Sequence, residues 1–152
     1  MIDETDRTLL GALQRDARQS FTALGKLVGL SSPAVAERVR RMEDIGLITG
    51  YTLQVDRRRL GWDITAMVRL TCPGEYYQAV HRLSQEMAEV LECHHVTGED
   101  SFMLKLIARD MAHLEAVIAR FRSFGHSVSS IVMSTNVEGK PVAPPSRRAA
   151  HG

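Results

Sequence analysis

Apolar residues recur at helical spacing through the first third of the chain, where they divide into three segments. The first segment covers residues 3–17, and Asp3 can form a capping box with Asp6 at its start. Its apolar stripe consists of Leu9, Leu10, Leu13 and Ala17. We expect this helix to support the two that follow it.

The second segment runs from Ser20 to Val28. Its apolar face consists of Phe21, Leu24, Leu27 and Val28. Gly29 can take the positive φ that ends a helix sharply, and Leu30 can then fill the angle before the next helix. The pattern predicts a short helix followed at once by a tight turn.

The third segment begins at Ser31 or Ser32, either of which can cap a helix whose first turn suits Pro33. The positions that face a core are Val35, Val39, Met42 and Gly46. The positions on the opposite side are Pro33, Glu37, Arg40, Arg41 and Asp44.

Two short helices joined by a tight turn with a glycine match the helix-turn-helix unit, whose second helix enters the DNA major groove. An ordinary helical hairpin would carry similar caps and spacing. The elements that follow therefore have to distinguish the two interpretations.

An extended segment is expected directly after Gly46. Leu47, Ile48 and Tyr51 fit a wing or a linking strand. Arg57–Arg59 follow it, either as phosphate contacts or as a solvated linker. We place a domain boundary near residues 60–62.

Beyond this boundary, apolar and polar residues begin to alternate, which is typical of strands. The expected order is a strand over 64–71, a helix over 77–87, strands over 90–97 and 102–108, a helix from Asp110 to near Gly125, and a strand over 128–137. This β-α-β-β-α-β order predicts a ferredoxin-like sandwich, an antiparallel sheet with both helices on one face. The fold class is therefore α+β.

The second face of the sheet would remain uncovered. Its apolar residues are expected to include Met67, Ile107, Ile131 and Met133. Exposed apolar patches of this kind usually mark interaction surfaces. We therefore expect a homodimer that packs sheet against sheet.

Composition and charge refine this picture only slightly. The chain has 152 residues, 44% of them apolar, and a net charge of +1. Residues 1–60 hold ten Lys and Arg against eight Asp and Glu, a weak basic bias. DNA affinity would therefore come from a few arginines and from dimerisation.

Cys72 and Cys93 form neither a disulfide framework nor a zinc spacing, which leaves two half-buried thiols. No basic-then-apolar leader and no apolar run of about eighteen residues indicates secretion or membrane insertion. We expect a cytoplasmic protein without a membrane partner.

The chain resembles the Lrp/AsnC family of transcriptional regulators. The motifs that carry the resemblance are IDETDRTLLGAL, GLSSPAVAERVRRMEDIGLITGY and VTGEDSFMLKLIARDMAHLE, within residues 2–138. It implies a winged helix-turn-helix DNA-binding domain and a ligand-sensing, dimerising domain. Family members form dimers and often octamers, and they bind amino acids between dimers. The implied partners are thus double-stranded DNA, an amino-acid effector and further copies of this chain.

The resemblance assigns DNA contacts to the third helix, namely Ser32, Pro33, Ala36, Glu37, Arg40 and Arg41. Arginines there can pair with guanine edges, a contact worth about 1–3 kcal/mol of discrimination. Glu37 would read cytosine or repel wrong sequences. Arg38 lies nearer the buried side, which suggests a structural or phosphate-binding role.

The implied effector site is built around Gly98, Glu99, Asp100, Ser134 and Thr135. A glycine turn exposes backbone amides to a carboxylate, and Asp100 or Glu99 can pair with an ammonium group. Without the resemblance, Asp100 would be read as a turn residue that bonds its own backbone.

The implied organisation is a DNA-binding domain over 1–50, a linking strand over 51–61, a sensing and dimerisation domain over 62–138, and a flexible tail over 139–152. Gly25 departs from the family, which usually has alanine there. An interior glycine costs about 1 kcal/mol of helix stability, so we expect local softening.

Two other functions remain open. Siroheme decarboxylases resemble the same layout, and the histidines and Cys93 raise the possibility of a haem or metal site. However, adjacent His94 and His95 on a strand point to opposite faces and cannot share one metal. We therefore expect no catalytic residues, metal or cofactor. The other alternative is an architectural DNA-binding protein without an effector.

Overall fold

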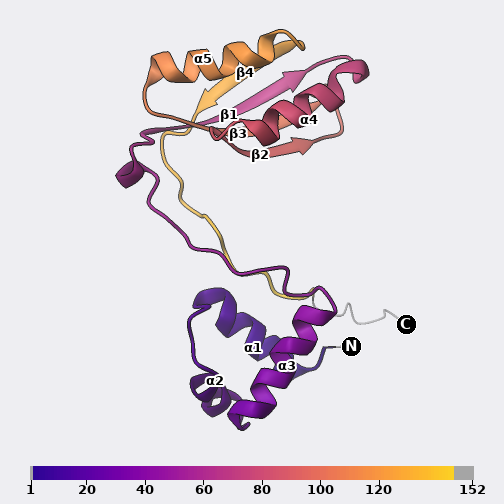
Figure 1. Cartoon of the computed structure of the whole chain (residues 1–152), viewed down its shortest axis with the longest axis vertical. Helices are drawn as coiled ribbons and strands as arrows, with labels where there is room; N and C mark the ends of the chain where they lie inside the picture. Colours follow the sequence, from indigo (N-terminus) through magenta and orange to yellow (C-terminus); the bar gives the residue numbers. More distant parts are fainter. Residues whose placement is uncertain (1, 146–152) are drawn as a thin grey trace, which may run out of the picture. The chain divides into compact units, whose positions relative to one another are not determined.

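The computed structural model describes residues 2–145, which fold into two compact units (Figure 1). The first unit contains the chain up to Leu53 and returns at Val137, whereas the second contains Gln54–Asn136. No helix within the described range is both long and apolar enough to cross a membrane.

The first unit is built from three helices, α1 (Glu4–Arg15), α2 (Phe21–Val28) and α3 (Ser32–Asp44). Asp3, Ser20 and Ser31 cap them through their side chains, and Asp3 forms the predicted capping box. Gly29 ends α2 in the left-handed conformation. The helices enclose a core of Leu9, Ala12, Leu13, Leu24, Val35, Val39 and Met42.

Three apolar positions do not face this core as the spacing predicted. Phe21 and Leu27 are 41% and 55% exposed, and Ala17 is exposed beyond the end of α1. The reason is the shortness of α2, which has eight residues and buries only Leu24 and Gly25. Phe21 begins the helix, and Leu27 lies about 100° around it from Val28.

Gly25 is required by the turn between α2 and α3. A Cβ at this position would lie 2.4 Å from the Leu30 carbonyl oxygen. The Leu30 N–H in turn donates to the Gly25 carbonyl at 2.9 Å. The expectation of local softening was therefore wrong, because the glycine allows the turn to close tightly.

The second unit is a four-stranded antiparallel sheet with strand order β2-β3-β1-β4. The strands are β1 (Ile64–Thr71), β2 (Val90–His95), β3 (Phe102–Ala108) and β4 (His126–Ile131). Helices α4 (Tyr77–Glu86) and α5 (Met111–Arg122) cover one face (Figure 1). Short 3-10 turns, η1 (Arg58–Leu60) and η2 (Gly74–Tyr76), precede β1 and α4. The predicted ferredoxin-like arrangement is confirmed.

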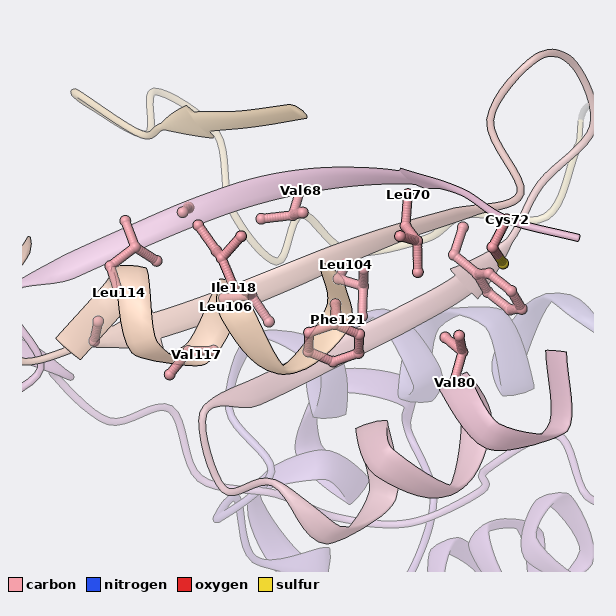
Figure 2. Close-up of a cluster of buried hydrophobic side chains, with 13 residues drawn as sticks. Val68, Leu70, Cys72, Val80, Leu104, Leu106, Leu114, Val117, Ile118 and Phe121 are labelled. Carbon is pink, nitrogen blue, oxygen red and sulfur yellow. The ribbon is translucent and has the colours of Figure 1, made fainter. Parts of the chain in front are cut away.

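Every second residue of β1 enters the core beneath the helices. Ala66, Val68 and Leu70 are almost completely buried and meet Phe121 of α5 and Val80 of α4 (Figure 2). The intervening residues of β1 lie on the opposite, open face of the sheet. This alternation determines which side chains remain available for function.

The register corrects two of the residues predicted for the open face. Ile131 pairs with Ala66 and therefore lies on the helix side, because paired residues share a face. The fourth strand ends at Ile131, so Met133 lies beyond the sheet and is 87% exposed. Met67 and Ile107 do lie on the open face, and Ile107 is 4% exposed.

The segment after α3 forms no strand within this chain. Residues 51–56 have no regular structure, and Asp56 then organises η1 by accepting from the Arg58 N–H at 3.0 Å. Arg59 pairs with the same carboxylate at 3.4 Å. A wing strand needs a hydrogen-bonded neighbour, which the described part of a single chain does not supply.

The last described residues contact α1. The Gln14 amide donates to the Val142 carbonyl at 3.0 Å and accepts from the Val142 N–H at 2.8 Å. Pro141 and Pro144 help to line a cavity of about 370 Å³ beside the helix. The tail predicted over 139–152 is described only to residue 145; the remainder lies outside the described residues.

Replacement of Gly25 by alanine should lower the free energy of unfolding by about 1–3 kcal/mol, the usual range for a core clash. Gly11→Ala is the matched control, because no atom lies within 4 Å of a Cβ there. It should raise stability by about 0.5–1 kcal/mol. Chemical denaturation of both variants would measure the difference, and equal effects would contradict the proposed close approach.

Candidate nucleic-acid interface and effector loop

Helix α3 presents a polar stripe to solvent. Pro33, Glu37, Arg40 and Asp44 are exposed, while Val35, Val39 and Met42 are buried beneath them. Arg40 lies 3.8 Å from Glu37, and both side chains are at least 70% exposed. Such a pair contributes little energy, so Arg40 can exchange it for another partner.

Two of the predicted contact residues are only half-exposed. The Ser32 hydroxyl lies 2.9 Å from the Thr22 hydroxyl, which joins the start of α3 to α2. Ala36 is half-buried next to the exposed stripe. These residues therefore lie at the edge of the outward face.

A buried carboxylate connects α1 to α3. Asp6 is fully buried, and its two oxygens accept from Arg38 at 2.9 Å and from Arg41 at 2.5 Å. Arg38 also contacts Asp3 at 2.6 Å. The structural role suggested for Arg38 agrees with these contacts. Arg41, which the sequence placed among the DNA contacts, also has a structural role.

The same contacts shift two pKa values in opposite directions. The Asp6 N–H and then Arg38 hold the pKa of Asp3 below its ordinary value of 3.8. Asp3, followed by Asp6, raises the pKa of Arg38. Because the pKa of Asp3 is depressed by folding, its stabilising effect is present above pH 3.8 and is lost as pH falls through the folded value.

The chain leaving α3 is fixed by Tyr51. Its hydroxyl donates to Glu43 at 2.7 Å. Burial, followed by this carboxylate, raises the pKa of Tyr51 to about 12. Tyr51 therefore remains a neutral donor, and the hydrogen bond attaches the extended segment to the end of α3.

The loop between β2 and β3 carries Gly98, Glu99 and Asp100. Gly98 has φ of +116°, a conformation that favours glycine. Ser101 anchors the loop to the end of β1, because its N–H donates to Leu70 and its buried hydroxyl donates to the Cys72 carbonyl at 3.0 Å. The hydroxyl also accepts from the Cys72 N–H at 3.1 Å. Burial raises the pKa of the Cys72 thiol, which Ser101 partly opposes.

Asp100 faces two side chains from β1. Its carboxylate lies 3.5 Å from Arg69 and accepts from the Thr71 hydroxyl at 3.4 Å. No backbone hydrogen bond within the turn is among its recorded contacts. The carboxylate is thus directed across the end of the open face.

The structure does not bring all five predicted effector residues together in one chain. Ser134 and Thr135 follow Val132, whose N–H donates to the Thr65 carbonyl. Asp100 instead contacts Thr71, six residues along β1 and so about 20 Å away. A site containing both groups would need more than one subunit.

The histidines have separate environments. His94 contacts Glu92 at 3.1 Å, whereas neighbouring His95 packs against Tyr77 with ring centroids 4.8 Å apart. His113 lies 3.1 Å from Glu89. Over residues 2–145, no three side chains of His, Cys, Asp or Glu are grouped to hold a metal ion.

Comparison with known proteins assigns both units. Residues 2–43 match the AsnC-type helix-turn-helix domain, and residues 65–142 match the Lrp/AsnC ligand binding domain. The chain belongs to the Lrp/AsnC family of transcriptional regulators. The polar stripe of α3 is therefore part of a DNA-binding domain, and the β2–β3 loop lies within a ligand-binding domain.

Two curated members and one solved structure illustrate the family relationship. An HTH-type transcriptional regulator of Mycobacterium tuberculosis is 38% identical over 92% of this chain and 97% of its own length. The leucine-responsive regulatory protein of Salmonella typhimurium is 35% identical over 73% of this chain and 70% of its own. Bacillus subtilis LrpC has a TM-score of 0.86 at 29% identity, covering 92% and 99% of the two chains.

Sequence reasoning missed three residues of this Lrp/AsnC chain. Arg69 and Thr71 face Asp100, and Ser101 anchors its loop. Arg69 could have been noticed, because it is the single charged residue in the strand ITAMVRLT. The hydroxyl contact of Ser101 depends on the meeting of β1 with a distant loop and leaves no local pattern.

Substitution of Asp6 by asparagine should lower the free energy of unfolding by about 3 kcal/mol, because two arginines lose a buried carboxylate. Glu37→Gln is the control, since its exposed pair with Arg40 should contribute less than about 0.5 kcal/mol. Circular dichroism during thermal unfolding would compare them. A similar small change in both variants would show that the buried pairs do not stabilise the helical unit.

Proposed function

We propose that this Lrp/AsnC regulator recognises specific double-stranded DNA through α3, and that an amino acid bound at the β2–β3 loop alters this recognition. The observation that carries the proposal is the division of labour on α3. Arg38 and Arg41 are engaged by Asp6, whereas Arg40 remains exposed on the outward stripe.

Arg40 is the best candidate for reading bases. An exposed guanidinium can form two hydrogen bonds to guanine in the major groove. Glu37 on the same stripe can accept from cytosine or repel other sequences. Pro33, Ser32 and Ala36 then set how closely the start of α3 approaches the groove.

Arg41 is better suited to contact phosphate. Its side chain is 49% exposed even though one nitrogen donates to Asp6. A guanidinium has five N–H donors, so the remaining ones are available. The contact with Asp6 restricts the orientation of Arg41 and so reduces the entropy lost when it meets DNA.

The effector site is proposed around Gly98, Glu99 and Asp100. Asp100 can pair with an ammonium group, and the loop is anchored by Ser101. A related protein is named as leucine-responsive, which supports an amino acid as the ligand class. Ser134 and Thr135 would join this site from another subunit.

Assembly is proposed as a homodimer through the open face of the sheet, with further association to an octamer. Met67 and Ile107 supply apolar surface near the middle of that face. Effector binding between subunits would then shift their arrangement and the spacing of the DNA-binding units. The proposed location is the cytoplasm, where a bacterial-type regulator meets its DNA.

Arg40→Ala should weaken binding to the operator by roughly 10- to 150-fold, the equivalent of losing about 1–3 kcal/mol of base recognition. Binding to random DNA should change much less. Arg82→Ala, which replaces an exposed arginine of α4, is the control. Fluorescence anisotropy at fixed salt would measure both, and equal losses on operator and random DNA would assign Arg40 to phosphate contact.

Asp100→Ala should abolish the effect of amino acids on DNA binding and leave binding itself intact, because Asp100 lies outside the helical unit. Glu75→Ala replaces an exposed carboxylate near the start of α4 and should respond like the wild type. Anisotropy titrations with and without an amino-acid mixture would test this. A wild-type protein indifferent to every amino acid would favour the architectural role.

A further inference from the structure

Arg69 lies between two apolar residues at the same level of the sheet. The register places it opposite Met103 on β3 and opposite Val128 on β4. Side chains of directly opposed residues in antiparallel strands lie on the same face and are in contact range. Val128 is 39% exposed and Met103 is half-buried, so apolar surface remains on both sides of the guanidinium.

The pair formed by Arg69 and Asp100 is available for exchange. Its distance is 3.5 Å, and the Arg69 and Asp100 side chains are 52% and 28% exposed. Exposed pairs of this length contribute about 0–1 kcal/mol. A ligand that offers better geometry to each charge can therefore separate them at little cost.

The two charges are also held in place. Asp100 accepts from Thr71, and its loop is fixed by the buried hydroxyl of Ser101. Arg69 belongs to β1, a central strand of the sheet. A positive and a negative group on a rigid frame form a preorganised receptor for a zwitterion.

We propose that Arg69 binds the α-carboxylate of the effector, that Asp100 binds its α-ammonium group, and that Met103 and Val128 receive an apolar side chain. This proposal rests on the proposed function and deepens it by naming a ligand class. The ligand is an aliphatic α-amino acid.

The surroundings oppose a charged ligand side chain. On the β2 side, Glu92 is engaged by His94 and by Lys105, each at 3.1 Å, and these contacts lower the pKa of Glu92. Burying a charge against Met103 and Val128 without a partner is unfavourable. Selectivity for aliphatic side chains follows from the two strands next to Arg69.

The site lies at the margin of the proposed dimer surface. Arg69 is two residues along β1 from Met67 and four from Thr65, which pairs with Ile107. Apolar contact centred on Met67 and Ile107 would leave Arg69 near the rim of the interface. A ligand there could contact a neighbouring subunit and still bind through this chain's own charges.

Isothermal titration of the full-length protein would test the proposal with defined probes. L-Leucine should bind at least tenfold more tightly than L-glutamate or L-lysine. L-Leucinamide, which lacks the carboxylate, and 4-methylpentanoate, which lacks the ammonium group, should each lose at least tenfold. Wild-type preference for a charged side chain would overturn the ligand class while leaving amino-acid regulation intact.

Arg69→Gln should weaken L-leucine binding at least tenfold and remove its advantage over L-leucinamide. Arg69→Lys should retain part of that advantage, because it keeps the charge. Arg82→Gln is the matched surface control, and thermal unfolding would confirm that each variant is folded. A folded Arg69→Gln protein that still discriminates leucine from leucinamide would refute the role of Arg69. If no amino acid binds the wild type, both this assignment and the proposed effector response fail.

Discussion

The buried carboxylate of Asp6 is the constraint on which the DNA-binding unit depends. Removing a charge from water is unfavourable unless partners replace the lost solvation. Arg38 and Arg41 supply them from α3, so α1 and α3 can pack only in the register that joins these groups. The electrostatic requirement thereby fixes which side of α3 faces outward, and Arg40 is left on that side.

Much of the fold could be predicted because its signals are local. The capping box at Asp3 and the stop at Gly29 depend on neighbouring residues and were confirmed. Features set by distant contacts could not be predicted. The face occupied by Ile131 depends on its pairing with Ala66, and the need for Gly25 depends on the approach of a carbonyl from the turn.

The candidate site shows the same division. Outward positions of α3 follow from helical periodicity, so Arg40 was located correctly as an exposed residue. Periodicity did not reveal that Arg41 shares a carboxylate with Arg38, since Asp6 belongs to another helix. The partners of Asp100 were missed because β1 and the β2–β3 loop meet only after the sheet has formed.

Contact between Gln14 and Val142 gives the first unit a second connection to the rest of the chain. One connection is the covalent segment after Leu53, and the other is a reversible contact made by the returning tail. Because the covalent segment keeps the partners together, the tail experiences an effective concentration on the order of millimolar. Two hydrogen bonds too weak to hold separate molecules can therefore stay formed within the chain. A proteolytic cut in the covalent segment would dilute the tail's partner and convert this lasting contact into a transient one.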